Sequence, residues 1–419
     1  MEKTFSLLQT DKNHFAESEI SDFFKGVLSY ALNLYGQKKI LVVVPDITRQ
    51  YSFANIFANL CLQKMKNKIK AIMPALGTHR MMSGAEIKKM YPDIPVELFV
   101  EHDWRKNTTR LGTIENDFVE NITEGAFRDD IGISVNKMLP DPDLSLIVSI
   151  GQVVPHEVFG MSNHTKNIFV GCGAKETIDK SHFASAAYGI EKILGKTNNP
   201  IRGIFDEAYS RFSAKMPPVL WVMTVTDGTA LSAVFAGFDR RCFEEAAEYS
   251  AKINITKLQN KQKKIVVYLD PVQYRSTWIA NKAIYRTRMA IANGGELVII
   301  APGLQICGED STCDSVIRNY GYANADFIRQ NAYTIPDLKN NLSAAAHMIH
   351  SSSENRFTIR YCTSNKMSSA YIESLGFKWC GIEEANKIYD PLTLKNGLNI
   401  SKEGEEFFFI NNPSSGLWM

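Results

Sequence analysis

Short runs of apolar, mostly β-branched residues alternate along this chain with longer stretches of helical periodicity, and this alternation constrains the fold most strongly. The apolar runs are typical of buried strands; they span 39–44, 70–75, 144–151, 219–225, 265–269, 297–301 and 356–361. Helical periodicity spans 17–34, 53–66, 243–253 and 277–293, and the last stretch ends in Asn293-Gly294-Gly295, a helix-stop signal. Strands that alternate with helices predict an α/β fold with mainly parallel sheets.

The polar and basic stretch 254–264 is the best candidate for a domain boundary, because a new strand begins directly after it. A charge run of this kind is equally compatible with the exposed end of a helix that crosses between domains. We therefore expect two α/β domains, 1–257 and 258–419, with the active site in the cleft between them. The tail 400–419 becomes aromatic toward its end, so we expect it to pack, with the first domain as a candidate surface.

Charge and targeting signals exclude several classes of protein. Lys and Arg number 47 against 45 Asp and Glu, a net charge of +2, whereas a nucleic-acid-binding domain usually carries a basic face. No apolar run approaches the roughly 18 residues of a membrane span, and the first residues lack the core of a signal peptide. The 7 scattered cysteines do not resemble a disulfide framework. We expect a cytoplasmic protein with no nucleic-acid or membrane partner.

Ionisable side chains follow three of the predicted strands. Asp46 and Arg49 follow the first, His79 follows the second, and His156 follows the strand 144–151. Side chains beyond the carboxyl ends of parallel strands converge where α/β proteins bind ligands, and a pair of imidazoles suits proton transfer near neutral pH. The alternative is structural: Asp46 bonds to the amide two residues on, as in an Asx turn, and each histidine fills a turn or packs.

The segment 156–173 contains small and polar residues, several glycines and Lys166. Backbone amides and an ammonium in such a loop can bind a phosphate. The segment lacks the pattern of a nucleoside-triphosphate loop, so an anion-binding loop and a plain connector are equally compatible with it.

The order and spacing of these motifs resemble the nickel-dependent lactate racemase family. The motifs are Asp-Ile-Thr-Arg at 46–49, Gly-Thr-His-Arg at 77–80, the segment 156–166, and Ser-His at 181–182. The steps of 10 residues from His156 to Lys166 and 26 residues to His182 match the family's spacing. The resemblance extends over roughly 40–310.

The resemblance implies a racemase or epimerase of a 2-hydroxy acid that works by reversible hydride transfer to a nickel-pincer nucleotide. It implies that His79 and His156 form the acid–base pair and that His182 is the protein ligand of nickel, which imidazole suits well. Lys166 matches the lysine to which the cofactor is tethered. Asp46 and Arg49 match residues that orient a histidine and bind substrate. The implied partners are a small 2-hydroxy acid and the proteins that synthesise and load the cofactor.

Two departures from the family pattern affect these expectations. The family's Ser-Gly-Gly-Arg-Lys is here Ser-Asn-His-Thr-Lys at 162–166, so we expect Ser162 and His164 to contact the cofactor beside Lys166. Arg275 and Trp278 occupy the positions of a glutamine and a lysine of the lactate enzymes. As substrate-binding residues they would favour a larger or differently charged 2-hydroxy acid than lactate.

Two other functions remain open at this point. The altered loop is compatible with a non-catalytic, cofactor-binding member of the same fold. A zinc hydrolase could instead use His79, His156 and His182 as its three ligands, although a His-Glu-x-x-His helix is absent from the sequence. The pair His347 and His350 has helical spacing, and we expect it to lie on a surface or to pack.

Overall fold

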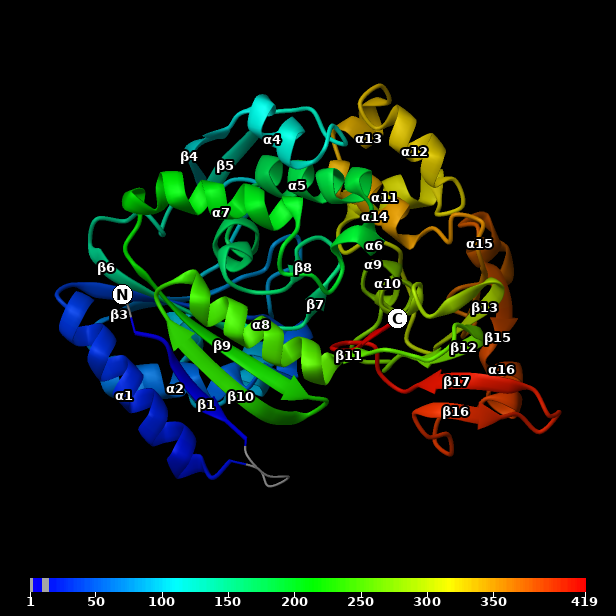
Figure 1. Cartoon of the computed structure of the whole chain (residues 1–419), viewed down its shortest axis with the longest axis horizontal. Helices are drawn as coiled ribbons and strands as arrows, with labels where there is room; N and C mark the ends of the chain where they lie inside the picture. The colour runs from blue at the N-terminus through cyan, green and yellow to red at the C-terminus, as the bar shows by residue number, and fades with distance from the viewer. Residues whose placement is uncertain (1–2, 10–14) are drawn as a thin grey trace. The chain divides into compact units, whose positions relative to one another are not determined.

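The computed structural model describes residues 3–9 and 15–419 (Figure 1). Its contacts divide into two compact units, Met1–Ser181 with Ile193–Asn254, and His182–Lys192 with Ile255–Met419. Each unit is built on a mainly parallel sheet with helices, which confirms the predicted fold class. The main division follows residue 254, close to the predicted boundary after 257, and the second unit also takes in the short segment 182–192.

The first unit contains a six-stranded sheet in which β9, β6, β2 and β3 run parallel. At one edge, β10 pairs antiparallel with β9, and β1 pairs antiparallel with β10. In sheet order the strands are β1 (Phe5–Leu8), β10 (Ala230–Gly237), β9 (Val219–Asp227), β6 (Leu144–Gln152), β2 (Lys39–Val44) and β3 (Ile69–Pro74). Two antiparallel two-stranded sheets accompany it, β4 (Thr108–Ile114) with β5 (Ile131–Asn136), and β7 (Pro155–His156) with β8 (Gly160–Met161).

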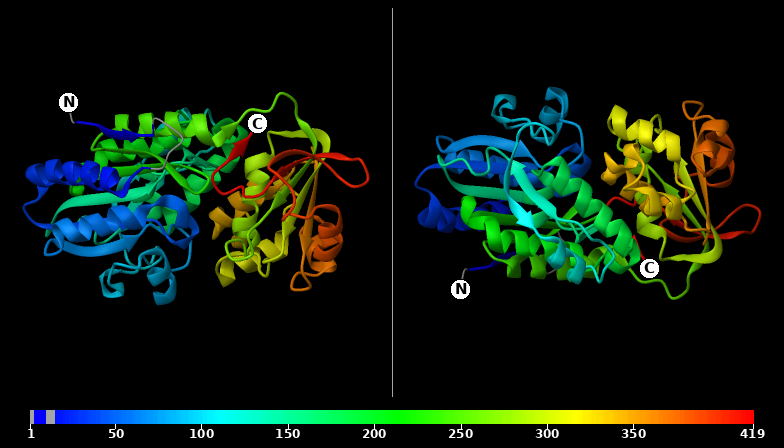
Figure 2. Two further views of the ribbon diagram at one scale, coloured as in Figure 1. Left: turned by 90° about the horizontal axis from the view of Figure 1, so that it is seen from below. Right: turned by 90° about the horizontal axis from the view of Figure 1, so that it is seen from above.

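Alternation along the strands places apolar side chains on both faces of this sheet, and helices cover both faces (Figure 2). Leu220 and Val222 of β9 join the core cluster formed with α1 (Glu17–Tyr35) and α2 (Ala54–Met65). Helix α8 (Arg240–Asn254) contacts β9 and β10. Burial on both faces explains why these strands read as continuous apolar runs.

The remaining helices of this unit are short or capped by local signals. Helix α7 (Pro200–Phe212) begins at Asn199, whose side chain accepts the N–H of Arg202, with Pro200 at the first helical position. The others are α3 (Gly84–Met90), α4 (Asn116–Ile122) and α5 (Lys175–Tyr188), the last of which continues into the segment 182–192 of the second unit.

The second unit contains another six-stranded sheet, parallel except for its last pair. In sheet order the strands are β15 (Lys378–Gly381), β14 (Thr358–Thr363), β13 (Ile291–Ala301), β12 (Gln262–Tyr268), β17 (Glu406–Ile410) and β16 (Gly397–Ile400). Its helices are α6 (Ile190–Ile193), α9 (Thr277–Ala280), α10 (Lys282–Thr287), α11 (Ser311–Tyr320), α12 (Ala325–Asn331), α13 (Pro336–Lys339), α14 (Leu342–Ser351), α15 (Ser369–Ser374) and α16 (Ile382–Ile388). Throughout the described ranges, we find no helix with the length and apolar character that crossing a membrane requires.

The structure corrects the predicted helix over 277–293. Helix α9 ends at Ala280 and α10 at Thr287, and β13 already begins at Ile291, so the Asn-Gly-Gly stretch lies inside a strand. The pairing of β13 with β12 shifts register across this stretch, and Gly294 has a φ of +76°. Its N–H bonds to the carbonyl of Arg356 at 2.6 Å. The glycines therefore form a bulge, the other structure that glycine favours within a strand.

The structure also corrects the expectation that the tail 400–419 packs on the first domain. β17 is inserted beside β12 in the second sheet, and its aromatic residues are buried there. The last strand, β18 (Leu417–Trp418), pairs in parallel with β11 (Ile255–Thr256). The tail belongs to the second unit because its aromatic run completes that unit's sheet.

Candidate active site

Asp46 lies in the turn that follows β2, at the start of the 3₁₀ turn Ile47–Ser52. One of its carboxylate oxygens, Oδ1, accepts the backbone N–H of Thr48 at 3.1 Å and the hydroxyl of Thr48 at 2.6 Å. The other, Oδ2, lies 2.6 Å from Nδ1 of His79. The Asx turn and the predicted site role are therefore both present, because each uses a different oxygen of one buried carboxylate.

His79 is brought to Asp46 by sheet topology. β2 and β3 are parallel neighbours, so the turns after them leave the same edge of the sheet. Gly77, with a φ of +59°, turns the chain after β3, and its N–H bonds to the carbonyl of Gly171 at 2.9 Å. The result is a carboxylate–imidazole pair formed by residues 33 positions apart in the sequence.

The Asp46 carboxyl is ionised in this setting. Burial alone would raise its pKa, but the facing His79 and the two donors of Thr48 hold that pKa well below its ordinary value. An ionised carboxylate only accepts hydrogen bonds, so Nδ1 of His79 carries the proton and donates it. Nε2 of His79 is then the nitrogen with the lone pair.

His156 follows β6, which is the neighbour of β2 on the side away from β3. Its ring is buried and lies edge-on to Phe159, with the ring centroids 5.6 Å apart. Its Nδ1 accepts the backbone N–H of Val158 at 3.1 Å. A carboxylate oxygen of Glu157 lies 3.9 Å from the same nitrogen. Asp46, His79 and His156 therefore follow three adjacent parallel strands, as the sequence predicted.

Lys166 lies close to several of these groups. It precedes the π-helical turn Asn167–Gly171 and is partly exposed. Burial lowers the pKa of its ammonium to about 8, and the guanidinium of Arg49 acts in the same direction, whereas the carboxylates of Glu157 and Asp46 oppose the shift. The amine of Lys166 is thus within electrostatic reach of groups from two strand-end turns.

Glu157 was not singled out from the sequence. Its only signal there was an acidic residue directly after His156 in a strand-end loop. Its carboxylate lies 3.9 Å from Nδ1 of His156 and raises the pKa of the Lys166 ammonium.

The structure places the Ser162 side chain inside the turn. Its hydroxyl donates to the carbonyl of Gln152 at 2.7 Å and accepts the N–H of Val154 at 2.9 Å. Asn163 has a φ of +72°, and its amide donates to the carbonyl of Gly151 at 2.7 Å. These side chains hold the loop against the end of β6, so the predicted contact of the Ser162 hydroxyl with a cofactor is not supported.

His164 is also turned inward, which corrects its expected position beside the cofactor. Its imidazole is 2% exposed and lies between the rings of Trp221 and Phe243, at centroid distances of 4.5 and 5.2 Å. Burial lowers its pKa well below the usual range, and the charges of Arg202 and Arg240 add to the shift. A neutral ring among aromatic side chains is part of the core.

His182 lies in helix α5 and is partly exposed. The contacts divide α5 just before this residue, so His182 belongs to the second unit, whereas His79 and His156 belong to the first. Its role as a metal ligand stays a prediction.

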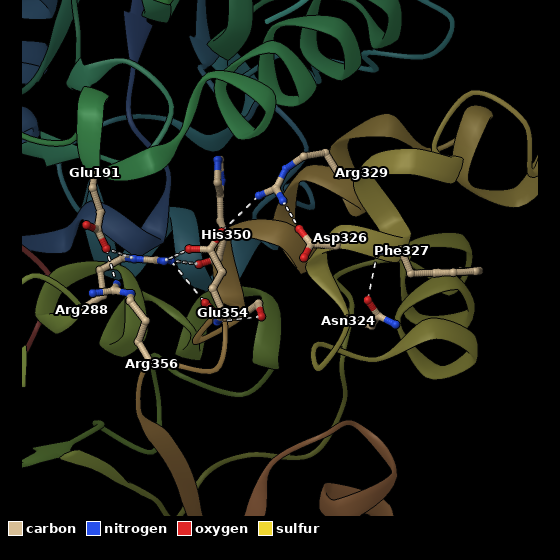
Figure 3. Close-up of polar contacts among 10 residues, drawn as sticks. Glu191, Arg288, Asn324, Asp326, Phe327, Arg329, His350, Glu354 and Arg356 are labelled. Carbon is tan, nitrogen blue, oxygen red and sulfur yellow. Dashed lines mark hydrogen bonds and ion pairs between the residues drawn. The ribbon is translucent and has the colours of Figure 1, made fainter. Parts of the chain in front are cut away.

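The segment 182–192 is fastened within the second unit by Glu191 (Figure 3). The side chain of Arg288 is fully buried, and its Nε donates to Glu191 at 2.9 Å. A second guanidinium nitrogen of Arg288 donates to Glu354 at 2.7 Å. Arg356 also pairs with Glu191. A buried guanidinium between two carboxylates fixes the end of this segment to the loop after α14.

A ring contact anchors the other end of the segment. The rings of Phe183 and Tyr333 meet edge to face, with centroids 5.7 Å apart. Arg329 extends the charged network by pairing with Glu354 at 3.2 Å and Asp326 at 2.6 Å (Figure 3). His182 is therefore carried on a segment held at both ends.

Arg275 lies shortly before helix α9 of the second unit, and Trp278 lies within this helix. Arg275 is exposed and Trp278 is partly buried. The indole of Trp278 stacks on His347 at a centroid distance of 4.4 Å, and the nitrogens of His347 bond to the hydroxyls of Tyr285 and Tyr322 at 2.6 and 3.0 Å. His347 is thus a packing residue, one of the two roles expected for it, and substrate contact by Arg275 and Trp278 stays a prediction.

Part of the chain is similar to a known protein family. Residues 30–191 match the family described as Lactate racemase N-terminal domain. No curated protein sequence matches the chain significantly. A crystal structure of a Thermotoga maritima protein superposes with a TM-score of 0.82 at 23% identity, covering 98% of this chain and 100% of that one. The lactate racemase apoprotein from Thermoanaerobacterium thermosaccharolyticum superposes with a TM-score of 0.68 at 19% identity, covering 97% of this chain and 93% of that one.

At these identities the two solved structures establish a shared fold. The family match covers the elements that carry Asp46, His79, His156 and Lys166, and it supports a function of the racemase or epimerase type. Over residues 30–191, the chain is therefore similar to the lactate racemase family.

Proposed function

We propose that this protein is a racemase or epimerase of a 2-hydroxy acid other than lactate and that it uses a nickel-pincer nucleotide. The observation that carries the proposal is the bonded pair of Asp46 and His79 beside the amine of Lys166. An imidazole held by a carboxylate takes up a hydroxyl proton near neutral pH. A lysine with a lowered pKa is the nucleophile that a tethered cofactor requires.

Different residues of the chain transfer the substrate's hydroxyl proton, bind its carboxylate and contact its side chain. His79 takes the hydroxyl proton of one configuration at Nε2, and His156 serves the opposite configuration, because the two configurations present their hydroxyl groups differently. Arg49 and Arg275 are the candidates to bind the carboxylate, since a guanidinium makes two parallel bonds to it. Trp278, fixed by its stack on His347, provides an apolar wall for the substrate side chain.

The donor groups fit a metal that arrives in an organic cofactor. Among residues 3–9 and 15–419, no three His, Cys, Asp or Glu side chains gather as metal ligands. A zinc hydrolase needs three protein ligands, so that alternative gains no support. A pincer nucleotide would need one imidazole, that of His182, and the amine of Lys166, and when bound it supplies a reversible hydride acceptor.

The substrate class follows from Arg275 and Trp278. Arg275 occupies the position of a glutamine of the lactate enzymes, and Trp278 occupies the position of a lysine. An amide and an amine are therefore replaced by a guanidinium and an indole. The change favours a 2-hydroxy acid with a larger side chain than the methyl group of lactate.

The test is the full chain produced together with the proteins that build and load the cofactor. A panel of 2-hydroxy acids and sugar acids is followed by chiral chromatography, and nickel is measured by elemental analysis. We expect interconversion of one panel member, its loss in His79→Ala and His156→Ala, and loss of bound nickel in His182→Ala. His164→Phe, a core substitution in the same loop, is the matched control and should keep activity.

Three outcomes contradict the proposal. Bound nickel without turnover on any substrate would indicate a cofactor-binding protein that is not an enzyme. Absence of nickel from every loaded preparation, or interconversion by protein made without the cofactor proteins, would refute the cofactor assignment.

A further inference from the structure

The two histidines of the site differ in the partner of Nδ1. In His79 this nitrogen faces the carboxylate of Asp46 at 2.6 Å. In His156 it faces the backbone N–H of Val158 at 3.1 Å. A carboxylate accepts a proton in a hydrogen bond and an amide N–H supplies one, so these two partners select opposite tautomers of a neutral imidazole.

His79 rests in the tautomer of a base. Its proton is on Nδ1 and is donated to Asp46, so Nε2 offers a lone pair to a substrate hydroxyl. When Nε2 takes up a proton, the imidazolium remains bonded to an ionised carboxylate. No rearrangement of the ring's partners is needed.

His156 rests in the other tautomer. Its Nδ1 lone pair accepts the N–H of Val158, so its proton is on Nε2. In this state Nε2 donates a hydrogen bond but has no lone pair with which to take a proton. To act as a base, His156 must carry its proton on Nδ1 instead of Nε2. The N–H of Val158 is a donor, so it cannot accept a hydrogen bond from Nδ1–H.

The carboxylate of Glu157 is positioned to accept that proton. Its Oε2 lies 3.9 Å from Nδ1 of His156, outside hydrogen-bond range but within reach of a small rotation of either side chain. The same carboxylate interacts with the ammonium of Lys166, around which Arg49 and Asp46 also lie. The guanidinium of Arg202 also lowers the pKa of Lys166.

We infer that Glu157 is a positioning residue that makes His156 competent as a base, by replacing Val158 as the partner of Nδ1. This inference rests on the proposed function. The change is proton-neutral: the ring proton moves from Nε2 to Nδ1 through solvent, Nδ1–H bonds to Glu157, and Nε2 then accepts the substrate hydroxyl proton. The two configurations of the substrate are therefore handled unequally, one by a base that is ready and one by a base that must first change partner.

The resting tautomers are tested without cofactor. In the full chain labelled with ¹⁵N-histidine, long-range ¹H–¹⁵N spectra distinguish a protonated ring nitrogen from an unprotonated one, and His79→Gln and His156→Gln assign the two rings. We expect a proton on Nδ1 of His79 and on Nε2 of His156. A proton on Nδ1 of His156 at rest would overturn the inference.

The role of Glu157 is tested in the loaded enzyme with Glu157→Met, which keeps the approximate size of the side chain and removes the hydrogen-bond acceptor. Because a racemase at equilibrium must be slowed equally in both directions, the readout is single-turnover formation of the 2-oxo acid from each configuration separately. We expect at least a 10²-fold loss from the configuration served by His156, as for a missing general base, and a change below about 3-fold from the other.

Asp46→Asn is the mirror variant and should slow the opposite configuration. Equal slowing of both configurations by Glu157→Met, or parental rates for both, would overturn the inference. Failure of the proposed function looks different: the parent enzyme would then form no 2-oxo acid from either configuration.

Discussion

The bond between Asp46 and His79 predicts a measurable loss of stability in Asp46→Asn. The asparagine Oδ1 can still accept both donors of Thr48, so the turn after β2 is preserved. The new NH₂ group cannot accept the Nδ1–H of His79, so the charge-assisted bond is lost. The substitution therefore removes one interaction and leaves the local cap in place.

The expected cost is about 2 kcal/mol at neutral pH, the middle of the range for a hydrogen bond to a charged group. Asp46 is buried, which favours the full value, while the side chain of His79 is 27% exposed, which reduces it. The folded protein holds the pKa of Asp46 below its value in the unfolded chain. This stabilisation is therefore complete above the unfolded pKa, near 4, and is lost as pH falls through the folded value.

The assay is urea unfolding of the cofactor-free protein at pH 7.5, 5.5, 4 and 3, with hydrogen exchange of β2 and β3 used to identify the transition of the first unit. The matched control is Asp143→Asn, which removes an exposed carboxylate 3.3 Å from Lys70 and should cost under about 1 kcal/mol. The difference between Asp46→Asn and the parent should shrink only as pH falls below the unfolded pKa, near 4. Equal stability of Asp46→Asn and the parent at pH 7.5, or a difference that does not shrink between pH 4 and pH 3, would refute the reasoning.

Three further predictions concern other buried groups. Arg288→Met should lower the unfolding free energy of the second unit by about 3 kcal/mol in urea, because it leaves two carboxylates without their buried partner; an unchanged value would contradict the anchoring role. Acylation of Lys166, followed by mass spectrometry of its peptide, should reach half its maximal rate near pH 8, and a midpoint near that of ordinary lysines would disprove the effect of its surroundings. His164→Phe should reduce the loss of stability below pH 6.5, because the folded state resists protonation of the buried ring and so loses stability as pH falls; an acid profile like that of the parent would place His164 outside the core.

The local parts of this structure could be predicted from the sequence. The β-branched runs become strands because both faces of each sheet are buried, and the predicted run over 39–44 coincides with β2. The turn at Asp46 depends on a side chain and an amide two residues apart, so residue type alone indicates it. Because three such runs are parallel strands, their carboxyl ends also indicated where Asp46, His79 and His156 lie.

Only the tertiary structure decided which groups meet and which turn away. The Asp46–His79 bond joins residues from two strands, and the inward turn of His164 depends on Trp221 and Phe243, which are distant in the sequence. The Asn-Gly-Gly stretch after residue 292 is a helix stop by its composition but a bulge in a strand by its pairing partner. Side-chain partners, tautomers and burial are set by contacts between distant segments, and no local pattern in the chain contains them.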